Sequence, residues 1–138
     1  YFQADVIREA THGGTHMDAP LHFSQGGWDV SQIPLERMMF VPVALIDIER
    51  QSDRNSSYKL AVSDIENWER RHGRLPDGGV LLVRTGWSKV SALYCSMYNL
   101  ENLADMRCIP ATGGHVNAMP MKIPGASGAP VRVVVVLP

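Results

Sequence analysis

Four side chains that can bind metal occupy alternate positions in one short segment near the start of the sequence. Residues 12–22 read His-Gly-Gly-Thr-His-Met-Asp-Ala-Pro-Leu-His, which places His12, His16, Asp18 and His22 on even positions. In an extended chain such positions lie on one face. Two imidazoles and a carboxylate suit zinc, manganese or iron, and three protein ligands leave positions open for water and substrate. The pattern predicts a catalytic rather than a structural metal site.

The backbone of this segment is predicted to be a bent strand followed by a loop. The pair Gly13-Gly14 and a nearby proline disfavour a helix, although a helix would also bring His12 and His16 together. Fully extended, these two histidines would be almost too far apart to meet at one ion, so the glycine pair must bend the chain. His22 is then either a further ligand or an acid/base beside the metal.

Three apolar runs rich in β-branched residues have the length of strands covered on both faces. They are Val41–Ile48, Val80–Thr85 and Val131–Leu137. Between the first two, Ser63 is predicted to cap a helix that Glu66 closes with a capping box and that stops at Gly73. Weaker patterns predict a helical turn within 100–106 and a strand over 119–123 interrupted by a proline.

The overall composition indicates one globular domain of α/β or α+β type, spanning residues 1–138. The chain is 45% hydrophobic and 20% charged, which is enough to bury a single core. Its net charge of -1, with acids and bases interspersed, provides no basic stripe for nucleic acid. No apolar run approaches the ~20 residues that span a bilayer. Cys95 and Cys108 are too few for a disulfide framework.

These features predict a soluble protein that acts on a small molecule, without nucleic-acid or membrane partners. The cytoplasm is favoured, and secretion stays open because the sequence begins without a methionine.

The string HGGTHMDAPLHF resembles the signature His-x-Gly-Thr-His-x-Asp-x-Pro-x-His of the cyclase family, which includes bacterial-type kynurenine formamidases and isatin hydrolases. Further blocks follow in family order, so the resemblance covers most of the chain. They are the loop 27–29, the block 80–87 ending at Trp87, residues 100–103, and residues 119–131. The resemblance implies a swivelling β/β/α-type single domain with a mixed sheet or barrel and few helices, and a homodimer or higher homo-oligomer.

The resemblance also implies roles for the site residues and a divalent cofactor, zinc or manganese. His12, His16 and Asp18 would be metal ligands, and His22 would be the catalytic histidine. In two-metal relatives Asp18 would match a bridging carboxylate, and Glu101 looks like the glutamate that completes the second ion. From spacing alone, an exposed acid at the end of a helix is an equally good interpretation of Glu101.

The reaction implied is hydrolysis of an amide C–N bond by metal-activated water, converting N-formyl-L-kynurenine to L-kynurenine and formate. Two alternatives stay open: hydrolysis of a cyclic amide such as isatin, and a non-catalytic shortened paralogue or isoform. Phe23 or Trp28 would offer an apolar wall to an aromatic substrate, although burial in the core is the commoner role for such residues.

The sequence departs from the family between Trp87 and Tyr98, where relatives carry a longer stretch with a strand and a further histidine ligand. The domain is therefore interpreted as shortened between about 88 and 97 and truncated at its N-terminus, which would expose the edges of neighbouring strands. Neither His72 nor His115 stands at the missing position. His72 is predicted to be a helix-end cation and His115 a loop histidine.

Overall fold

The strands of the computed structural model close into a barrel; the structure describes residues 1–86, 92–95 and 98–138. The strands are β1 His16–Asp18, β2 Val41–Asp47, β3 Val80–Arg84, β4 Ala92–Cys95, β5 Tyr98–Glu101, β6 His115–Pro120 and β7 Gly128–Val136. Around the barrel their order is β1-β5-β4-β3-β2-β6-β7, and β7 pairs back onto β1. The pair β2–β3 is parallel and the other pairs are antiparallel, so the sheet is mixed as predicted.

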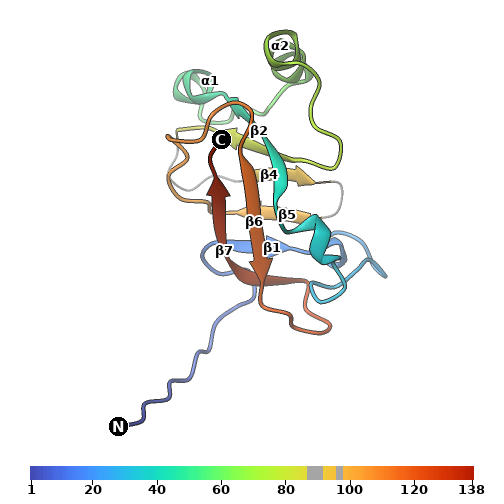
Figure 1. Cartoon of the computed structure of the whole chain (residues 1–138), viewed down its shortest axis with the longest axis vertical. Helices are drawn as coiled ribbons and strands as arrows, with labels where there is room; N and C mark the ends of the chain where they lie inside the picture. Colours follow the sequence, from blue (N-terminus) through green and yellow to red (C-terminus); the bar gives the residue numbers. More distant parts are fainter. Residues whose placement is uncertain (87–91, 96–97) are drawn as a thin grey trace.

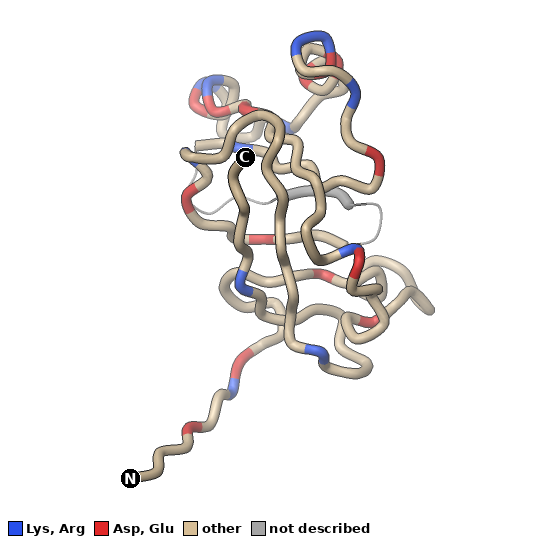
Figure 2. The backbone as a smooth tube through the Cα atoms, in the orientation of Figure 1, with Lys and Arg blue, Asp and Glu red and all other residues tan. Residues whose placement is uncertain are grey.

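Two α-helices and two short 3-10 turns complete the regular structure of the described residues. The helices are α1 Glu49–Arg54 and α2 Val62–His72, and the turns are η1 Pro20–His22 and η2 Leu35–Arg37. Both helices lie at one end of the barrel, whereas β1 and the N-terminal segment lie toward the other end (Figure 1). Each helix carries both acidic and basic residues (Figure 2). Neither is long and apolar enough to cross a membrane.

The three predicted apolar strands are present with small shifts in their ends. β2 and β3 each end one residue earlier than expected, and β7 begins three residues earlier, at Gly128. The prediction that all three are covered on both faces is wrong for β7. Val131 is buried, whereas Val134 and Val136 on the opposite face are exposed, because neither of the two described helices covers that side of β7.

The start of α2 corrects the predicted cap. The helix begins at Val62 with Ala61 as N-cap, and the Asp64 carboxylate accepts a hydrogen bond of 2.9 Å from the Ala61 N–H. Ser63 and Glu66 therefore lie inside the helix and make no capping box, since Asp64 already occupies the position that reaches back to the N-cap. The helix ends at Gly73 as predicted, where φ is +87°. Helix α1 was not anticipated.

Two weaker predictions fail for identifiable reasons. The segment 100–106 holds no helical turn, because Leu100 is buried in β5 opposite Met17 and the chain then turns at Asn102, where φ is +55°. The strand expected over 119–123 is instead β6, which begins at His115 and ends at Pro120. His115 is thus a strand residue rather than a loop residue, and its ring stacks on Phe40 at a centroid distance of 4.1 Å.

The region expected to be shortened does not leave a gap in the barrel. Strand β4 pairs with β3 on one side and with β5 on the other. The predicted exposed edges are therefore absent from the strands that the structure describes, because β4 supplies the missing neighbour. Residues 87–91 and 96–97, on which the rest of that prediction depends, lie outside the described residues.

Two apolar clusters hold the fold together. The barrel core fills the barrel interior, and its members include Met17, Leu82 and Leu100. The helix-side core lies between α2 and the β2–β3 pair and is built on Trp68, whose indole N–H donates to the Leu45 carbonyl at 2.8 Å. Trp28 and Phe23 belong to neither cluster, with 41% and 70% of their surface exposed, so the expectation that they are buried is wrong.

Candidate metal centre

Strand β1 presents two ligand-type side chains on one face. Met17 points into the barrel core with 0% exposure, so its neighbours His16 and Asp18 point the opposite way by strand alternation. On β5, Glu101 stands directly opposite His16 and Asn99 stands opposite Asp18. Side chains opposite one another in an antiparallel pair lie on the same face. The β1–β5 pairing therefore assembles these four polar residues into one patch.

Asp18 lies at the centre of this patch and is almost fully buried, with 2% exposure. Its Oδ1 atom is 2.7 Å from His12 Nδ1 and 3.2 Å from His16 Nε2, and its Oδ2 atom accepts a longer contact of 3.4 Å from Asn99 Nδ2. Among the described residues no lysine or arginine contacts it. A buried carboxylate requires a compensating charge. Protonated imidazole or a bound cation would provide that charge.

The contacts of His16 are consistent with positive charge beside Asp18. Its Nδ1 atom lies 2.9 Å from the Gly14 carbonyl, which can only accept, so Nδ1 carries the proton. In a neutral ring Nε2 is then a bare lone pair, and it faces Asp18 Oδ1 as well as Glu101 Oε2 at 3.7 Å. This arrangement is unfavourable unless positive charge lies between the nitrogen and the carboxylates. The bend at Gly14, where φ is +59°, aims its carbonyl at the ring.

His12 and His22 approach Asp18 from outside the β1–β5 patch. His12 lies in the turn before β1, and its ring is edge-on to that of His16 at a centroid distance of 5.3 Å. His22 ends the 3-10 turn η1 and lies beside His12, with ring centroids 4.2 Å apart. The side of His12 away from Asp18 contacts Ser127, with 2.9 Å between Nε2 and Oγ. His22 is exposed, so solvent and a substrate can reach it.

The structure brings all five predicted site residues together and divides them into two ligand groups that share Asp18. Ligand atoms lie within 4.8 Å of one another in two groups, His12–Asp18–His22 and His16–Asp18–Glu101. The division follows from topology, because Glu101 faces His16 across β1 and β5 whereas His12 and His22 come from turns. Imidazole nitrogens and carboxylate oxygens suit zinc or manganese. The individual roles of these residues remain predictions.

Asn99 and Ser127 belong to the site, although the sequence reasoning did not select them. Asn99 Nδ2 donates to Glu101 Oε1 at 3.0 Å, and within the described part of the chain its buried Oδ1 has no hydrogen-bond partner. Asn99 and Glu101 are two residues apart, so in a strand they point to the same face. The interpretation of residues 100–106 as helical concealed this relation. Ser127 lies in a segment that the sequence indicated only as a loop.

The loop that carries Ser127 is tied to residues 29–31. Asp29 accepts hydrogen bonds from the Ser31 hydroxyl at 2.7 Å and from the Gly125 N–H at 2.8 Å. These bonds, the Ser31 hydroxyl first, lower the pKa of Asp29 below its ordinary value. The Val30 N–H also donates to the Ala126 carbonyl at 3.0 Å. The loop is therefore held at residues 125 and 126.

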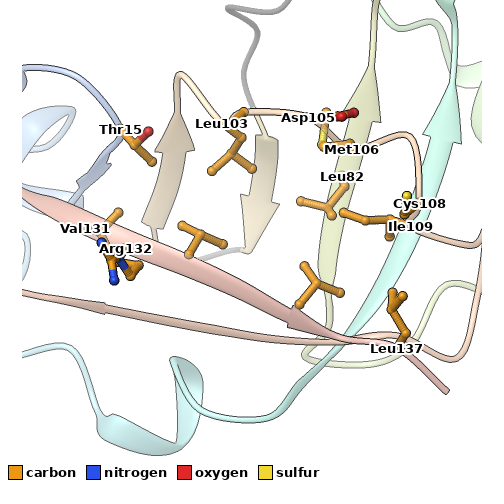
Figure 3. A pocket seen from close by; sticks show the side chains of 13 residues that line it. Thr15, Leu82, Leu103, Asp105, Met106, Cys108, Ile109, Val131, Arg132 and Leu137 are labelled. Carbon is orange, nitrogen blue, oxygen red and sulfur yellow. The ribbon is translucent and has the colours of Figure 1, made fainter.

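A separate cavity of about 470 Å³ opens beside the barrel core. Apolar side chains of β7 and of residues 103–109 line most of it, together with Thr15 and Leu82 (Figure 3). None of the five candidate site residues is among those that line it. The candidate metal centre and this cavity are therefore distinct features of the molecule.

Comparisons with known proteins agree with this architecture. The family model described as "Putative cyclase" matches residues 3–129. An isatin hydrolase of Roseibium aggregatum is 32% identical over 84 residues, which cover 56% of this chain but only 31% of that protein. A kynurenine formamidase of Salinibacter ruber is 28% identical over 166 positions, covering 93% of this chain and 77% of the relative. That alignment is longer than the present chain, so the relative carries residues without a counterpart here.

Solved structures confirm the predicted fold class. An isatin hydrolase bound to the product analogue thioisatinate has a TM-score of 0.82 at 20% identity, covering 95% of this chain and 74% of the other. Isatin hydrolase A from Labrenzia aggregata, bound to benzyl benzoate, has a TM-score of 0.79 at 26% identity, covering 90% of this chain and 72% of the other.

Proposed function

The chain belongs to the putative cyclase family, and we propose that it hydrolyses the C–N bond of a small aromatic amide at the cluster around Asp18. The substrate proposed is N-formyl-L-kynurenine, which gives L-kynurenine and formate. Similarity to a kynurenine formamidase along 93% of the chain supports this choice. The position of Glu101 beside His16 also supports it, because the two-metal formamidase pattern uses a glutamate there.

One observation carries the proposal: Asp18 is buried, and its carboxylate is shared between two groups of imidazole and carboxylate ligands. His16 Nε2 faces two carboxylates, and a positive ion beside them would offset their charge. Divalent metal, zinc or manganese, would be held by His12, His16, Asp18 and Glu101, with Asp18 common to the two groups. It would polarise the substrate carbonyl and lower the pKa of a water molecule.

The chain's own residues would supply proton transfer and positioning. His22 is exposed beside His12 and would accept a proton from the attacking water as its oxygen bonds to the formyl carbon. It would return that proton to the amine nitrogen as the C–N bond breaks. Phe23, whose ring is 4.7 Å from that of His22, is exposed and can pack against an aromatic substrate.

A cyclic amide such as isatin is the second candidate substrate. Solved isatin hydrolases match the fold with TM-scores of 0.82 and 0.79. The isatin hydrolase pattern of two histidines and an aspartate is met by His12, His16 and Asp18 without Glu101, so a site with one metal suffices for this alternative.

The test is to strip the purified chain with a chelator, reload it with zinc or manganese, and assay N-formylkynurenine and isatin separately. We expect metal-dependent release of formate from the first substrate. Faster turnover of isatin would shift the assignment to the cyclic amide. A chain that retains metal but hydrolyses neither substrate would contradict the proposal and favour a non-catalytic paralogue.

A further inference from the structure

We propose that Ser127 is a positioning residue for the metal centre, because its hydroxyl holds the imidazole of His12 in the orientation that lets Nδ1 bind a metal ion. This inference rests on the proposed function only in that a metal binds beside Asp18. Ser127 is separated from His12 by 115 residues, and the 2.9 Å contact between Oγ and Nε2 joins them.

His12 needs such a support because its backbone lies outside the barrel strands. The residue is in a turn, and residues 1–10 are exposed without regular structure. The ring is only partly buried, with 27% of the side chain exposed. Its two nitrogens are nevertheless both occupied, Nδ1 by Asp18 at 2.7 Å and Nε2 by Ser127. The ring is therefore fixed at both ends, by Asp18 of β1 and by the residue just before β7.

The residue after Ser127 shows that the ring is seated closely against β7. A Cβ atom placed on Gly128 would lie 2.6 Å from His12 Cε1 and 2.7 Å from the Met17 carbonyl oxygen. Both distances are far below van der Waals contact, so only glycine fits at this position. The start of β7 thus forms a recess that the imidazole fills.

The backbone of Ser127 is itself anchored to the metal centre. Its carbonyl accepts a hydrogen bond of 2.8 Å from the Ala19 N–H, directly after β1. Gly128 then pairs with Asp18 in the β1–β7 register. Ser127 therefore cannot move away from Asp18 without breaking the pairing that closes the barrel, and it holds His12 at a fixed distance from the carboxylate.

The chemistry of the hydroxyl suits this role. When Nδ1 binds a metal, the proton of a neutral imidazole must lie on Nε2, and a second hydrogen bond from that N–H normally fixes the ring of a metal-binding histidine. The Ser127 oxygen can accept this bond. It can also donate when Nε2 is unprotonated, because a hydroxyl has both functions. A methyl group at the same place can do neither.

The experiment compares Ser127→Thr with Ser127→Val, two variants of nearly equal shape that differ in the hydroxyl, alongside Ser127→Ala. Zinc affinity is measured by competition with a chromophoric chelator, and the exposed Ser24→Ala is the control. We expect Ser127→Val and Ser127→Ala to bind zinc roughly 10- to 100-fold more weakly than the parent, the usual cost of removing such a partner. Ser127→Thr should retain most of the affinity.

A second measurement does not depend on turnover. In long-range proton–nitrogen spectra of the zinc-loaded parent, His12 should show a protonated Nε2 and a metal-bound Nδ1, and this signature should be lost in Ser127→Val. Equal zinc affinity in the threonine and valine variants would overturn the inference while leaving the proposed function intact. Zinc binding without hydrolysis in the parent would contradict only the proposed function, and a parent that binds no zinc would overturn both.

Discussion

Asp64 in helix α2 and Asp18 in strand β1 lie at opposite ends of the barrel (Figure 1). The two carboxylates differ in the groups that contact them. Asp64 accepts hydrogen bonds from the Ala61 N–H and the Tyr58 hydroxyl, both at 2.9 Å, and a longer one from Gln51 at 3.5 Å. Asp18 is more deeply buried and has two imidazoles and one long amide contact. At the helix end, neutral protein donors satisfy the Asp64 carboxylate. At the β1 end, the Asp18 carboxylate needs positive charge in addition to its protein contacts.

Because of this difference, we expect the residues that determine stability and those that determine function to lie at different ends of the domain. Buried polar groups that have protein donors stabilise a fold, whereas a buried carboxylate without a cation opposes folding. Changes at the β1 end should therefore affect metal binding and catalysis more than stability. Changes at the helix end should have the opposite effect.

The largest effect is expected for Asp18→Ala, which removes the carboxylate shared by both ligand groups. Metal retention should be lost, because Asp18 is the ligand common to both groups and the two side chains left in each group bind a divalent ion poorly; amide hydrolysis should fall to the uncatalysed rate. The metal-free variant should be no less stable than the parent, since a buried charge has gone. Metal analysis and urea unfolding of the chelator-treated protein check this, with the exposed Asp53→Ala as control. Full metal content in Asp18→Ala would contradict the site.

Replacing His22 should separate proton transfer from metal binding. We expect His22→Ala to keep its metal and to slow hydrolysis by roughly 10²- to 10⁴-fold, the usual contribution of a general acid/base. Metal content and turnover are measured on the same preparation. Because His22 also lies within 4.8 Å of ligand atoms of His12 and Asp18, metal loss equal to that of Asp18→Ala would make it a ligand instead.

At the helix end, Trp68→Ala should lower the free energy of unfolding by about 3–5 kcal/mol, the usual cost of truncating a large buried aromatic residue. The indole packs in the helix-side core and donates to Leu45, so both contacts disappear. Urea unfolding checks the loss, and Trp28→Ala, at an exposed position, should change stability little. Zinc affinity of the folded Trp68→Ala protein should match the parent; a weaker value would mean that the two ends are coupled.

Removing the cap of α2 should have a smaller effect. Asp64→Ala is expected to cost about 1 kcal/mol of stability, and Glu66→Ala should cost almost nothing, because Asp64 rather than Glu66 bonds the N-cap. The hydrogen bond to Asp64 raises the pKa of the Tyr58 hydroxyl above 10.0. Absorbance titration of the phenolate should therefore show that pKa falling in Asp64→Ala and staying unchanged in Glu66→Ala.

The smallest effect is expected for Asp47→Asn. Burial raises the pKa of Asp47, but hydrogen bonds from Arg84 and the Glu49 N–H, with the charge of Arg84, outweigh burial and lower it below 3.8. A lowered folded-state pKa stabilises the protein above pH ~4, and that stabilisation disappears as the pH falls through the folded-state value. Since Asp47 is 44% exposed, the loss at pH 7 should be below about 1 kcal/mol. Unfolding measured at pH 7 and at successively lower pH should show this loss becoming smaller as the pH falls below ~4.

The sequence predicted the parts of the molecule that depend on local pattern. Alternation placed His16 and Asp18 on one face, and the apolar runs located β2, β3 and β7. The end of α2 at Gly73 could also be predicted from neighbouring residues. Such features are determined by neighbouring residues, so a single sequence contains them.

Features that depend on long-range pairing could not be predicted in the same way. The position of Asn99 follows from its register with Asp18, 81 residues away, and that of Ser127 follows from the pairing of β7 with β1. The division of the ligands into two groups that share Asp18 depends on the same pairings. Local propensity also misassigned residues 100–106, because burial of Leu100 against β1 decided their conformation.

The short strand β1 has a consequence for how the protein folds. It has three residues, yet it pairs with β5 and with β7, so the ring of strands closes only when the beginning and end of the chain meet. Contacts between residues so distant in sequence form slowly, because the loop between them must first lose conformational entropy. We therefore expect His12, Asp18 and Ser127 to assemble among the last events of folding. Capture of zinc by a refolding chain would then report ring closure, later than the burial of Trp68.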